Sequence, residues 1–477
     1  MTEETDQHVP LVVDMDGTLI NTDLLMEGSV AYIRQNPLRI LNCLFWMLQG
    51  KVILKQRIFS RIDFPYYTLP FNQPLLDFLQ EQKKTGRKLV LATASPLAAA
   101  RSVAAVHPIF DEVYGTDAVN LKGSNKLAML SEKFGAQGFD YVGNSYADLP
   151  VFAGARYAYL VNGSRWLERR TGKVARLKNY WPADRPNFLI SSVKAIRAYQ
   201  WVKNLLVFVP VITSHSLGFG NSIGKAFLAF LAFSFTASAG YVINDLFDLK
   251  SDRIHPRKCK RPFASGDLSL VAGAFLVILL LLSGVVTGAL LSWQFLALLF
   301  LYFVLSLSYS VVLKRLVLLD VFVLALLYST RVVGGGVATD IPISFWLIAF
   351  STFLFLNLAF VKRFSELMKV EGTSGLLERG REYINDDLPL LRSMGVVSGF
   401  VSVVVFSLYI NSPEMLRLYA RPHYLWGISL LFLFWICRIW VVTNRGNMTD
   451  DPVIYALKDK GSYVIFILVG LLLWMAT

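Results

Sequence analysis

Cysteine is scarce in this sequence, and the cysteines present are far apart. The 477 residues include three, Cys43, Cys259 and Cys437. No two of them have the short spacing of a metal-binding pair, and they do not form a framework of paired disulfides. A disulfide-stabilised fold and a cysteine-rich zinc module are therefore excluded. Cys259 lies in a basic segment, which favours a reducing, cytosolic environment for that segment.

We expect neither a signal peptide nor nucleic-acid binding. The first ten residues, MTEETDQHVP, are polar and acidic, whereas a signal peptide has a basic start followed by an apolar stretch. The net charge is +13, but the basic residues cluster beside apolar segments and no nucleic-acid-binding motif is present. Their position favours anionic lipid and phosphorylated substrates as partners.

Apolar residues are abundant, and their excess lies after residue 200. The sequence is 54% hydrophobic, and its mean hydropathy is +0.48. About 20 consecutive apolar residues are enough for a helix to span a bilayer. We therefore predict an all-α membrane domain of nine transmembrane helices, near 203–219, 224–246, 270–290, 293–312, 316–338, 342–361, 393–411, 424–443 and 461–476.

The distribution of Lys and Arg predicts how these helices are oriented. If the N-terminus is cytosolic, the loops on the cytosolic side contain 17 Lys and Arg residues and the opposite loops contain 2. Cytosolic loops are the ones enriched in these residues. We predict a multi-pass protein of the inner (plasma) membrane with a cytosolic N-terminal domain, and the sequence leaves a homo-oligomer open.

Near the N-terminus an apolar strand, LVVDMDGTLI, ends in two acidic residues. Asp14 and Asp16 are two residues apart, so both point to one side of the strand end. The segment resembles the DxDGT motif of haloacid-dehalogenase-like phosphatases. The resemblance implies that Asp14 is the nucleophile that accepts the phosphoryl group and that Asp16 is the general acid/base. It also implies magnesium, bound by both residues, to offset the charge repulsion.

Further motifs of that family follow in order. KLVLATAS is a second buried strand with Thr93 near its end, GSNKLAML carries Lys126, and FDYVGNSYADLP is a third strand followed by an acidic loop. By resemblance, Thr93 binds phosphate and Lys126 balances the charge of the phosphoaspartate. Asn144 and Asp148 belong to the magnesium site. The family usually has Asp where Asn144 stands, so an active phosphatase and an inactive, structural domain both stay open.

A helical cap is expected between the first two motifs, over residues 21–85. Within it, LRILNCLFWML at 38–48 is an apolar run that is too short to cross a bilayer. It is either a helix buried inside the cap or a face of the cap that dips into the membrane toward a lipid-linked substrate. We predict an α/β (Rossmannoid) domain with this cap over residues 1–165, a basic linker over 166–198 and the membrane domain over 199–477.

The most informative segment is YVINDLFDLKSDRIHPRKCKRPFASG, which follows a membrane helix. At 3.6 residues per turn, Asn244, Asp248 and Asp252 share one face of a helix, with Asp245 beside them. Magnesium accepts oxygen ligands from one or two carboxylates together with substrate phosphates. The basic residues that follow can bind phosphate oxygens; they are Arg257, Lys258, Lys260 and Arg261.

This pattern indicates a diphosphate site at a membrane surface, and the alternative is a solvated polar loop. The NDxxDxxxD spacing, together with the basic run after it, resembles the first aspartate motif of the UbiA-type prenyltransferase superfamily. Other candidates for substrate binding lie at the ends of the predicted membrane helices. They are Lys203, Asn204, Tyr241, Lys314, Lys362 and Arg363. For Lys203 and Lys314 an ordinary snorkelling or flanking charge is the alternative.

Two charged residues, Asp320 and Arg331, lie inside one apolar run. They are 11 residues apart, which places them on about one face but too far along the axis to pair with each other. Charges within a membrane usually face the interior of the helix bundle. We therefore expect each of them to have a partner on another helix and a structural role.

The third cytosolic loop has basic residues where many aromatic-acceptor relatives have a second aspartate motif. Lys362 and Arg363 share a helical patch with Glu366, and Arg379, Arg381, Tyr383 and Arg392 follow. This composition argues against a second face that binds a metal and a diphosphate, and it favours a site for additional phosphates.

The set QWVKN, NDLFDLKSD, HPRKCKRPFASG, SYSVVLK and VKRFSEL resembles the decaprenyl-phosphate phosphoribosyltransferase branch of the superfamily. The resemblance implies transfer of 5-phosphoribosyl from phosphoribosyl diphosphate to a polyprenyl phosphate, with magnesium. Asp248 and Asp252 would be catalytic, and with Asn244 and Asp245 they would hold the metal. The fused phosphatase would then remove the 5-phosphate of the product.

Two other functions stay open. One is a prenyltransferase that uses a polyprenyl diphosphate and an aromatic acceptor. The other is a transporter or receptor regulated by a degenerate phosphatase domain. The length of the lipid chain and the individual phosphate assignments of the basic residues are not determined by the sequence.

Overall fold

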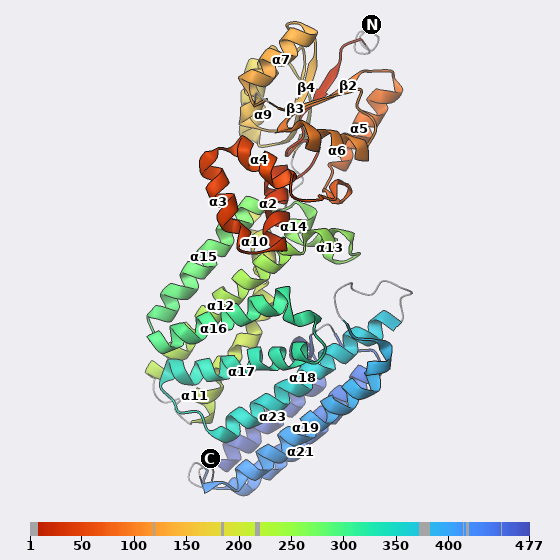
Figure 1. Ribbon diagram of the computed structural model, residues 1–477. Helices are drawn as coiled ribbons and strands as arrows, with labels where there is room; N and C mark the ends of the chain where they lie inside the picture. Colours follow the sequence, from red (N-terminus) through yellow and green to blue (C-terminus); the bar gives the residue numbers. More distant parts are fainter. Residues whose placement is uncertain are drawn as a thin grey trace. The chain divides into compact units, whose positions relative to one another are not determined.

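The computed structural model describes residues 8–117, 120–182, 186–214, 220–371, 382–413, 415, 419–449 and 451–477 (Figure 1). The chain divides into two compact units. The N-terminal unit combines Met1–Ala195 with Asp245–Phe275, and the membrane unit combines Ile196–Asn244 with Leu276–Thr477. The acidic and basic segment from Asp245 onward therefore belongs to the same unit as the phosphatase motifs.

A six-stranded, all-parallel sheet forms the centre of the N-terminal unit, with strand order β3-β2-β1-β4-β5-β6. The strands are β1 (Leu11–Val13), β2 (Leu89–Pro96), β3 (Glu112–Thr116), β4 (Asp140–Gly143), β5 (Ala158–Gly163) and β6 (Leu177–Pro182). The helices between them make every crossover long enough for parallel pairing. The predicted α/β fold is confirmed.

The strand residues alternate between two hydrophobic cores, one on each face of the sheet. Leu11 and Val13 pack in one core, and Val12 packs in the other, where its neighbours Val90 and Tyr141 also lie. Both faces are buried because helices cover both, as parallel sheets require. One face is covered by α5 (Gln73–Lys84) and α6 (Leu97–Val106), the other by α7 (Ser124–Phe134), α8 (Leu149–Gly154) and α9 (Arg165–Val174). Residues 165–182, predicted to lie mostly in a linker, thus supply α9 and the edge strand β6.

The cap consists of α2 (Leu24–Gln35), α3 (Arg39–Gln49) and α4 (Lys51–Phe59). Within α3, Trp46 is buried, whereas Leu41, Phe45 and Leu48 are exposed. The interpretation of this apolar run as a helix buried inside the cap is therefore wrong. Trp46 anchors α3 in the cap, and the described part of the N-terminal unit leaves the apolar face of the helix uncovered.

The acidic and basic segment forms short elements that pack within the N-terminal unit. They are α13 (Leu249–Ile254), η5 (Lys258–Lys260) and α14 (Pro262–Ser265), and α14 packs against α10 (Phe188–Ala195). Glycine ends α14, since Gly266 has φ +84° and a Cβ there would lie 3.2 Å from Asn21. The segment is therefore packed as part of the N-terminal unit.

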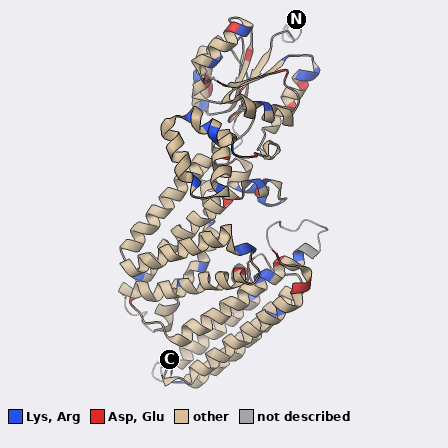
Figure 2. Cartoon of the chain, in the orientation of Figure 1, with Lys and Arg blue, Asp and Glu red and all other residues tan. Residues whose placement is uncertain are grey.

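The membrane unit is helical, and the described residues include seven helices that are long and apolar enough to cross a bilayer. They are α12 (Gly220–Phe247), α15 (Leu270–Ala289), α16 (Trp293–Val311), α17 (Leu319–Thr339), α18 (Phe345–Glu371), α19 (Leu388–Ile410) and α21 (Leu425–Asn444). Figure 2 shows long parts of these helices without charged residues. The chain is therefore an integral membrane protein of the multi-pass type.

The predicted count of nine membrane helices is not confirmed. The last predicted helix is α23 (Lys460–Ala476), which is apolar but only 17 residues long. The first predicted helix forms two short elements, η3 (Ala198–Phe208) and α11 (Val209–Thr213), and 215–219 lie outside the described residues. Pro210 at the start of α11 cannot donate a backbone hydrogen bond, which favours a break in the helix there.

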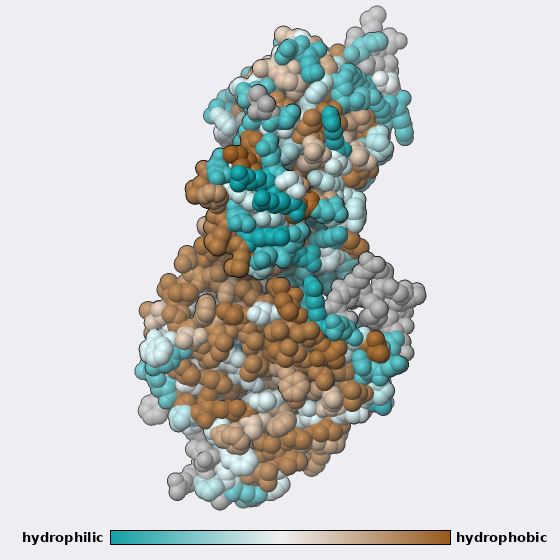
Figure 3. Space-filling view, viewed as in Figure 1, coloured by the Kyte–Doolittle hydropathy of each residue, from teal (hydrophilic) through white to brown (hydrophobic). Residues whose placement is uncertain are grey.

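The membrane helices differ in how much of their surface faces lipid. The apolar windows of α15 and α16 are 22% and 17% buried, whereas that of α17 is 72% buried. Brown, apolar side chains accordingly cover much of the surface of this unit (Figure 3). Close packing at the centre depends on glycine, because a Cβ on Gly335 of α17 would lie 2.0 Å from the carbonyl oxygen of Val207 in η3.

Candidate active sites

The phosphatase motifs meet where the strand order of the sheet reverses. Asp14 follows β1, Thr93 lies in the last half of β2, and Asn144 follows β4. These three strands are neighbours, with β1 between the other two. Ligands of open α/β sheets bind at this edge, outside the carboxyl ends of the strands. The sheet therefore brings the predicted catalytic residues of the N-terminal unit together.

Lys126 lies directly against the predicted nucleophile. Its Nζ is 2.6 Å from Oδ1 of Asp14 and 3.9 Å from Oδ1 of Asp148, and it donates to the hydroxyl of Tyr141 at 2.9 Å. Burial alone would lower the pKa of Lys126, but the two carboxylates outweigh it and raise that pKa. The ammonium therefore stays charged beside Asp14, as a group that balances a phosphoaspartate must.

Two donors hold the carboxylate of Asp16. The backbone N–H of Leu24 donates to Oδ1 at 2.8 Å, and the hydroxyl of Ser95 donates to Oδ2 at 2.7 Å. Lys55 of the cap donates to the same hydroxyl at 3.2 Å, and Thr93 Oγ1 accepts from the N–H of Ser95 at 3.1 Å. Burial raises the pKa of Asp16, which favours the protonated form that a general acid needs.

Asp148 organises the acidic loop. Its Oδ2 accepts from the backbone N–H groups of Asn144 and Ser145, at 3.3 and 3.0 Å, and from the hydroxyl of Ser145 at 2.7 Å. The side chain of Asn144 lies against Gly17, where a Cβ would be 2.1 Å from Nδ2. Gly17 leaves space for this amide, and its φ of +77° suits glycine. The amide of Asn144 therefore lies beside the turn that carries Asp14 and Asp16.

These residues fit a magnesium ion with a reduced acidic set. Among the described residues, no three His, Cys, Asp or Glu side chains gather closely enough to hold a metal. Asp14 and Asn144 offer one carboxylate and one amide oxygen, and magnesium binds such oxygens together with water and phosphate. Burial raises the pKa of Asp14 to about 7, against the opposing effect of Lys126. A proton therefore competes with the metal for Asp14 near neutral pH.

The aspartate motif does not lie on one continuous helix. Helix α12 ends at Phe247, and α13 begins at Leu249, with Asp248 between them at φ −93° and ψ 9°. The single helix that was predicted to carry Asn244, Asp248 and Asp252 is therefore interrupted at Asp248. Asn244 is the last residue of its segment in the membrane unit, whereas the three aspartates belong to the N-terminal unit.

Arg261 joins two buried carboxylates of the motif. Its Nη1 is 3.1 Å from Oδ1 of Asp245 and 2.6 Å from Oδ2 of Asp252. Asp245 is 2% exposed and Asp252 is 3% exposed. Burial raises the pKa of Asp252 to about 6, although Arg261 opposes the increase. The pair requires a cation, and two carboxylates beside an arginine fit magnesium on a diphosphate, whose oxygens would complete the coordination.

The rest of the basic run lies nearer to the surface. Arg257 and Lys260 are exposed, and Lys258 is half-buried. The backbone N–H groups of Arg257 and Lys258 donate to Nδ1 of His255 at 3.1 and 3.3 Å, which fixes the turn that presents them. Asp248 is half-buried and lies 3.9 Å from a guanidinium nitrogen of Arg34 in the cap.

In the membrane unit, a network of polar groups surrounds the first short helices. Lys203 forms a buried ion pair with Asp451, and Asn204 donates to Ser234 at 2.9 Å. Arg331 donates to Oδ1 of Asn204 at 2.7 Å and to the hydroxyl of Tyr302 in α16 at 2.7 Å. Arg331 therefore has partners on other elements, as expected. The interpretation of Lys203 as a snorkelling lysine is wrong, because its side chain is only 10% exposed and pairs inside the unit.

A second buried network joins α17 and α18. Arg363 forms ion pairs with Asp320 of α17 and with Glu366, and the hydroxyl of Tyr383 donates to Asp320 at 2.7 Å. The expected partner of Asp320 on another helix is thus confirmed. Arg363 is 2% exposed and is occupied by these carboxylates, so it supports α18 in this structure. Arg379 and Arg381, predicted to follow, lie outside the described residues.

The remaining predicted residues of the membrane unit are half-buried. Lys362 lies in the electrostatic field of Glu366 and Asp451. Tyr241 is covered by Arg197, whose guanidinium carbon is 5.3 Å from the ring centre. Lys314 lies in the short turn η6 (Leu313–Arg315). Lys203, Lys362 and Arg331 are electrostatic neighbours, so this part of the unit carries a cluster of positive charge.

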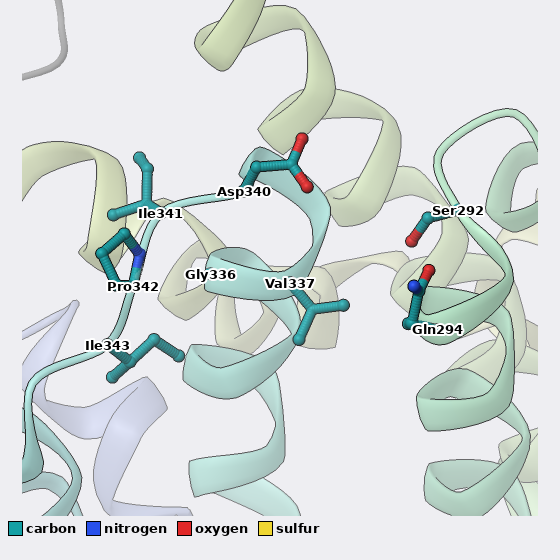
Figure 4. Close-up of a pocket in the computed structure, with 8 residues that line it drawn as sticks. All are labelled: Ser292, Gln294, Gly336, Val337, Asp340, Ile341, Pro342 and Ile343. Atoms are coloured by element: carbon teal, nitrogen blue, oxygen red, sulfur yellow. The ribbon is translucent and has the colours of Figure 1, made fainter.

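A surface pocket of ≈ 510 Å³ lies at the other end of α17 (Figure 4). Ser292 and Gln294 line it from one side, and residues from Gly336 to Ile343 line it from the other. By the helical rise of 1.5 Å per residue, Gly336 is about 24 Å along α17 from Asp320. The pocket is therefore remote from the network around Asp320, whereas Arg331 lies only about 7.5 Å from Gly336 along the same helix.

Comparison with known proteins agrees with both halves of the structure. The model of the UbiA prenyltransferase family matches residues 207–457, and the model of haloacid dehalogenase-like hydrolases matches residues 11–153. The first match covers more than half of the chain. The chain belongs to the UbiA prenyltransferase family.

Three relatives match this chain over most of their own length. An uncharacterized protein, y4nM, of Sinorhizobium fredii is 33% identical over 98% of this chain and 90% of its own. The nodulation protein NoeC of Azorhizobium caulinodans is 34% identical over 60% of this chain and 92% of its own. Decaprenyl-phosphate phosphoribosyltransferase of Mycolicibacterium smegmatis is 30% identical over 61% of this chain and 92% of its own.

Several residues of these networks were not predicted from the sequence. Asp451 pairs with Lys203 from 248 residues away, and Glu27 pairs with Arg253 from 226 residues away. Local periodicity in a sequence does not reveal which residues pair when they lie so far apart in the chain. Tyr141 and Ser95 each lie within a segment quoted for a motif, and their distance from Asp148 and Thr93 in the chain is short. Their hydroxyl contacts with Asp16, Lys126 and Asp148 depend on the fold and were not predicted.

Proposed function

We propose that the UbiA-type domain transfers 5-phosphoribosyl from phosphoribosyl diphosphate to a polyprenyl phosphate. The observation that carries the proposal is the buried positive cluster of the membrane unit around Lys203, Lys362 and Arg331. Together the donor and the lipid acceptor carry three phosphate-bearing positions, which suit such a cluster. A neutral aromatic acceptor would make no use of this surplus of positive charge, whereas phosphate oxygens would. The 30% identity to a decaprenyl-phosphate phosphoribosyltransferase supports the same assignment.

The proposed reaction is a substitution at the anomeric carbon of ribose. A phosphate oxygen of the lipid forms the new bond to this carbon, and the bond to the diphosphate breaks, so that inorganic diphosphate leaves. Magnesium on the diphosphate would lower the cost of its developing charge. Asp245, Asp248 and Asp252, with Asn244, are the candidates to hold the metal. Asp248 and Asp252 are the proposed catalytic pair.

The basic residues would bind the phosphates. Arg261 would turn from the carboxylates of Asp245 and Asp252 toward an oxygen of the diphosphate when the metal neutralises them. Arg257, Lys258 and Lys260 would screen the leaving group, and they are exposed or half-buried as that role requires. Lys203 and Lys362 would bind the 5-phosphate or the lipid phosphate, with Asn204, Tyr241, Lys314 and Arg363 as supporting residues. The lipid phosphate is already ionised and needs no general base.

We further propose that the N-terminal domain removes the 5-phosphate of the product. Asp14 would attack the phosphorus, the bond to the ribose oxygen would break, and Asp16 would give that oxygen its proton. Lys126 would balance the charge of the phosphoaspartate, and Thr93 would bind its phosphoryl oxygens. Water would then release inorganic phosphate and restore Asp14. Asn144 and Asp148 would complete a magnesium site with Asp14 and Asp16.

We also infer how the protein is arranged in the cell. The 17 to 2 distribution of Lys and Arg supports an inner-membrane protein with its N-terminal domain in the cytosol. In functional terms we propose three regions: a phosphatase domain over 1–165, a connecting region over 166–198 and a transferase domain over 199–477.

Mass spectrometry of lipid products tests both steps. The full chain is incubated in vesicles with isotopically labelled phosphoribosyl diphosphate and a short polyprenyl phosphate. We expect labelled, dephosphorylated lipid ribose from the natural chain and the 5-phosphorylated lipid from Asp14→Asn. Asp77→Asn, on α5, is the matched control and should behave as the natural chain. Consumption of a polyprenyl diphosphate with no use of phosphoribosyl diphosphate would instead assign an aromatic-acceptor prenyltransferase.

A further inference from the structure

Helix α3 presents an apolar face that the described part of its own unit leaves uncovered. Leu41 is 63% exposed, Phe45 is 58% exposed and Leu48 is 85% exposed. Trp46, on the other side of the helix, is 5% exposed and packs with Tyr32 in the cap. The helix is thus anchored on one side and apolar on the other. Exposed apolar surface of this extent marks an interaction site.

The charge around α3 identifies the partner. From Gly28 to Ile62 the sequence contains six Lys and Arg residues and no Asp or Glu. Arg57 and Arg61 lie over the ring of Trp46, with distances of 5.7 and 4.6 Å to its centre, and remain exposed. A helix with an apolar face and cationic flanks is the pattern of interfacial membrane helices, and its cations are attracted to anionic lipid.

A second helix of the N-terminal unit shares this property. In α10, Phe188 is 57% exposed, Leu189 is 69% exposed and Val193 is 55% exposed. Figure 3 shows apolar side chains at the place that α3 occupies in Figure 1, next to teal, polar ones. Two exposed apolar helices in one unit exceed the single apolar residues that are normal on a soluble surface.

We propose that α3 lies in the interface of an anionic bilayer, with Leu41, Phe45 and Leu48 among the acyl chains. The chain spans a membrane with other helices, so a bilayer surface is always present for the protein. A second protein copy would have to bring a complementary acidic face, and the positive charge around α3 makes self-association through this face unfavourable. The bilayer is therefore the occupant that both the apolar face and its charge fit.

The position of the cap extends the proposal to the substrate of the phosphatase. Helix α4 follows α3 after Gly50, and its Lys55 donates to the hydroxyl of Ser95, which holds Asp16. Helix α2 begins at Leu24, whose N–H donates to the same carboxylate. The helix in the membrane is thus directly joined to the residues of the phosphatase site. This part of the inference rests on the proposed function and specifies a phosphate carried by a lipid as the substrate class.

Fluorescence quenching tests the location of α3 in the full chain. The three natural cysteines are first removed by Cys43→Ser, Cys259→Ser and Cys437→Ser. Leu41→Cys or Leu48→Cys then provides one site, which is labelled with a nitrobenzoxadiazole dye. The protein is reconstituted in vesicles of phosphatidylcholine and phosphatidylglycerol. We expect quenching by lipids with a nitroxide on the acyl chain and protection from iodide in water. A label at exposed Glu132 on α7 is the control and should be quenched by iodide only.

Two results would overturn this location. Quenching by iodide at 41 and 48, as at 132, would place α3 in water. Excimer fluorescence from pyrene at position 41, without nitroxide quenching, would identify a second copy as the occupant. A label on the natural Cys43, in a chain lacking only the other two cysteines, gives the same measurement without changing any apolar residue of α3.

Activity on two substrates tests the consequence for the phosphatase. In Leu41→Glu/Leu48→Glu, hydrolysis of a lipid-linked phosphate in vesicles should fall about tenfold in kcat/KM, through a higher KM. Hydrolysis of soluble p-nitrophenyl phosphate should not change. Gln80→Glu, exposed on α5 and outside this segment, is the matched control. An unchanged rate on the lipid would refute the role of α3, whereas no hydrolysis of either substrate by the natural chain would refute the phosphatase while leaving the quenching result intact.

Discussion

Glu27 and Arg253 form a two-pronged, buried ion pair inside the N-terminal unit. Nη2 of Arg253 is 2.6 Å from Oε1 of Glu27, and Nη1 is 3.1 Å from Oε2. Glu27 is the fourth residue of α2, the helix whose first N–H donates to Asp16. Arg253 lies on α13, next to Asp252 of the aspartate motif. The pair therefore joins the helix at the phosphatase site to the segment that carries the proposed diphosphate ligands.

Replacing Glu27 tests how strongly this pair fixes the aspartate segment. Glu27→Gln would leave Arg253 buried without its charge partner, which costs about 3 kcal/mol in comparable sites. We expect a lower melting temperature and a loss of phosphoribosyl transfer, measured in vesicles. Glu132→Gln, on the surface of α7, is the control. Partial recovery in the charge-swapped pair, Glu27→Arg with Arg253→Glu, would support the pairing; an unchanged Glu27→Gln protein would contradict it.

Arg261 occupies the place between two carboxylates that a metal would share. In Arg261→Ala, Asp245 and Asp252 lose this cation, so the segment should bind divalent metal about tenfold more tightly. Transfer should nevertheless slow, because Arg261 no longer reaches the diphosphate. Electron paramagnetic resonance of added Mn²⁺ measures the affinity, and product formation measures the turnover. The exposed Lys260→Ala variant is the comparison. Weaker Mn²⁺ binding in Arg261→Ala would rule out competition between the arginine and the metal.

The contrast between Arg261 and its neighbours shows how far the sequence predicts the site. The resemblance to haloacid-dehalogenase-like phosphatases predicted Lys126 near Asp14, and the structure places the Nζ of Lys126 2.6 Å from Oδ1 of Asp14. The helical projection that aligned Asn244, Asp248 and Asp252 assumed an unbroken helix. The break at Asp248 has no proline or glycine to indicate it. Tertiary contacts such as Glu27 with Arg253 accompany the break, and local periodicity cannot reveal them.

The same limit applies to the membrane unit. Long apolar runs predicted seven of its helices because a bilayer requires about 20 apolar residues whatever the partners are. The run at 203–219 failed as a single helix, since Pro210 and the packing of η3 against Gly335 favour short elements. Arg331 and Asp320 were predicted to have partners because buried charges must be neutralised, but the partners themselves came only from the fold.

Lys203 and Asp451 provide a prediction for stability. Burial would raise the pKa of Asp451, but Lys203 and Lys362 outweigh it and lower that pKa below its usual value. A lowered pKa stabilises the fold above the unfolded value of 3.8, and this contribution is lost as the pH falls below that value. We expect the melting temperature in detergent to fall between about pH 5 and pH 3, and to fall less in Asp451→Asn.

The partner variant separates the pair from general acid unfolding. Lys203→Met leaves Asp451 buried without its main cation and should destabilise the protein by about 3 kcal/mol at neutral pH. Adding Asp451→Asn should recover part of this loss, because no uncompensated charge then remains. Lys225→Met, whose partner Asp340 is exposed, is the control and should have little effect. Equal melting temperatures for Lys203→Met and the natural chain would show that the pair does not form.

Asn144 and Asp14 together determine the magnesium requirement of the phosphatase. The pKa of Asp14 is raised to about 7 by burial, so at pH 6 most of the metal-free protein carries a proton on this group. Magnesium must displace that proton, and the half-saturating magnesium concentration should therefore be higher at pH 6 than at pH 8. Asn144→Asp adds a second carboxylate beside Asp14 and should lower this concentration about tenfold at pH 8.

Hydrolysis of p-nitrophenyl phosphate by the full chain, titrated with magnesium at both pH values, measures these changes. Asn125→Asp, on the surface of α7, should match the natural chain. A magnesium requirement that is the same at both pH values and in Asn144→Asp would exclude a metal held between Asp14 and residue 144.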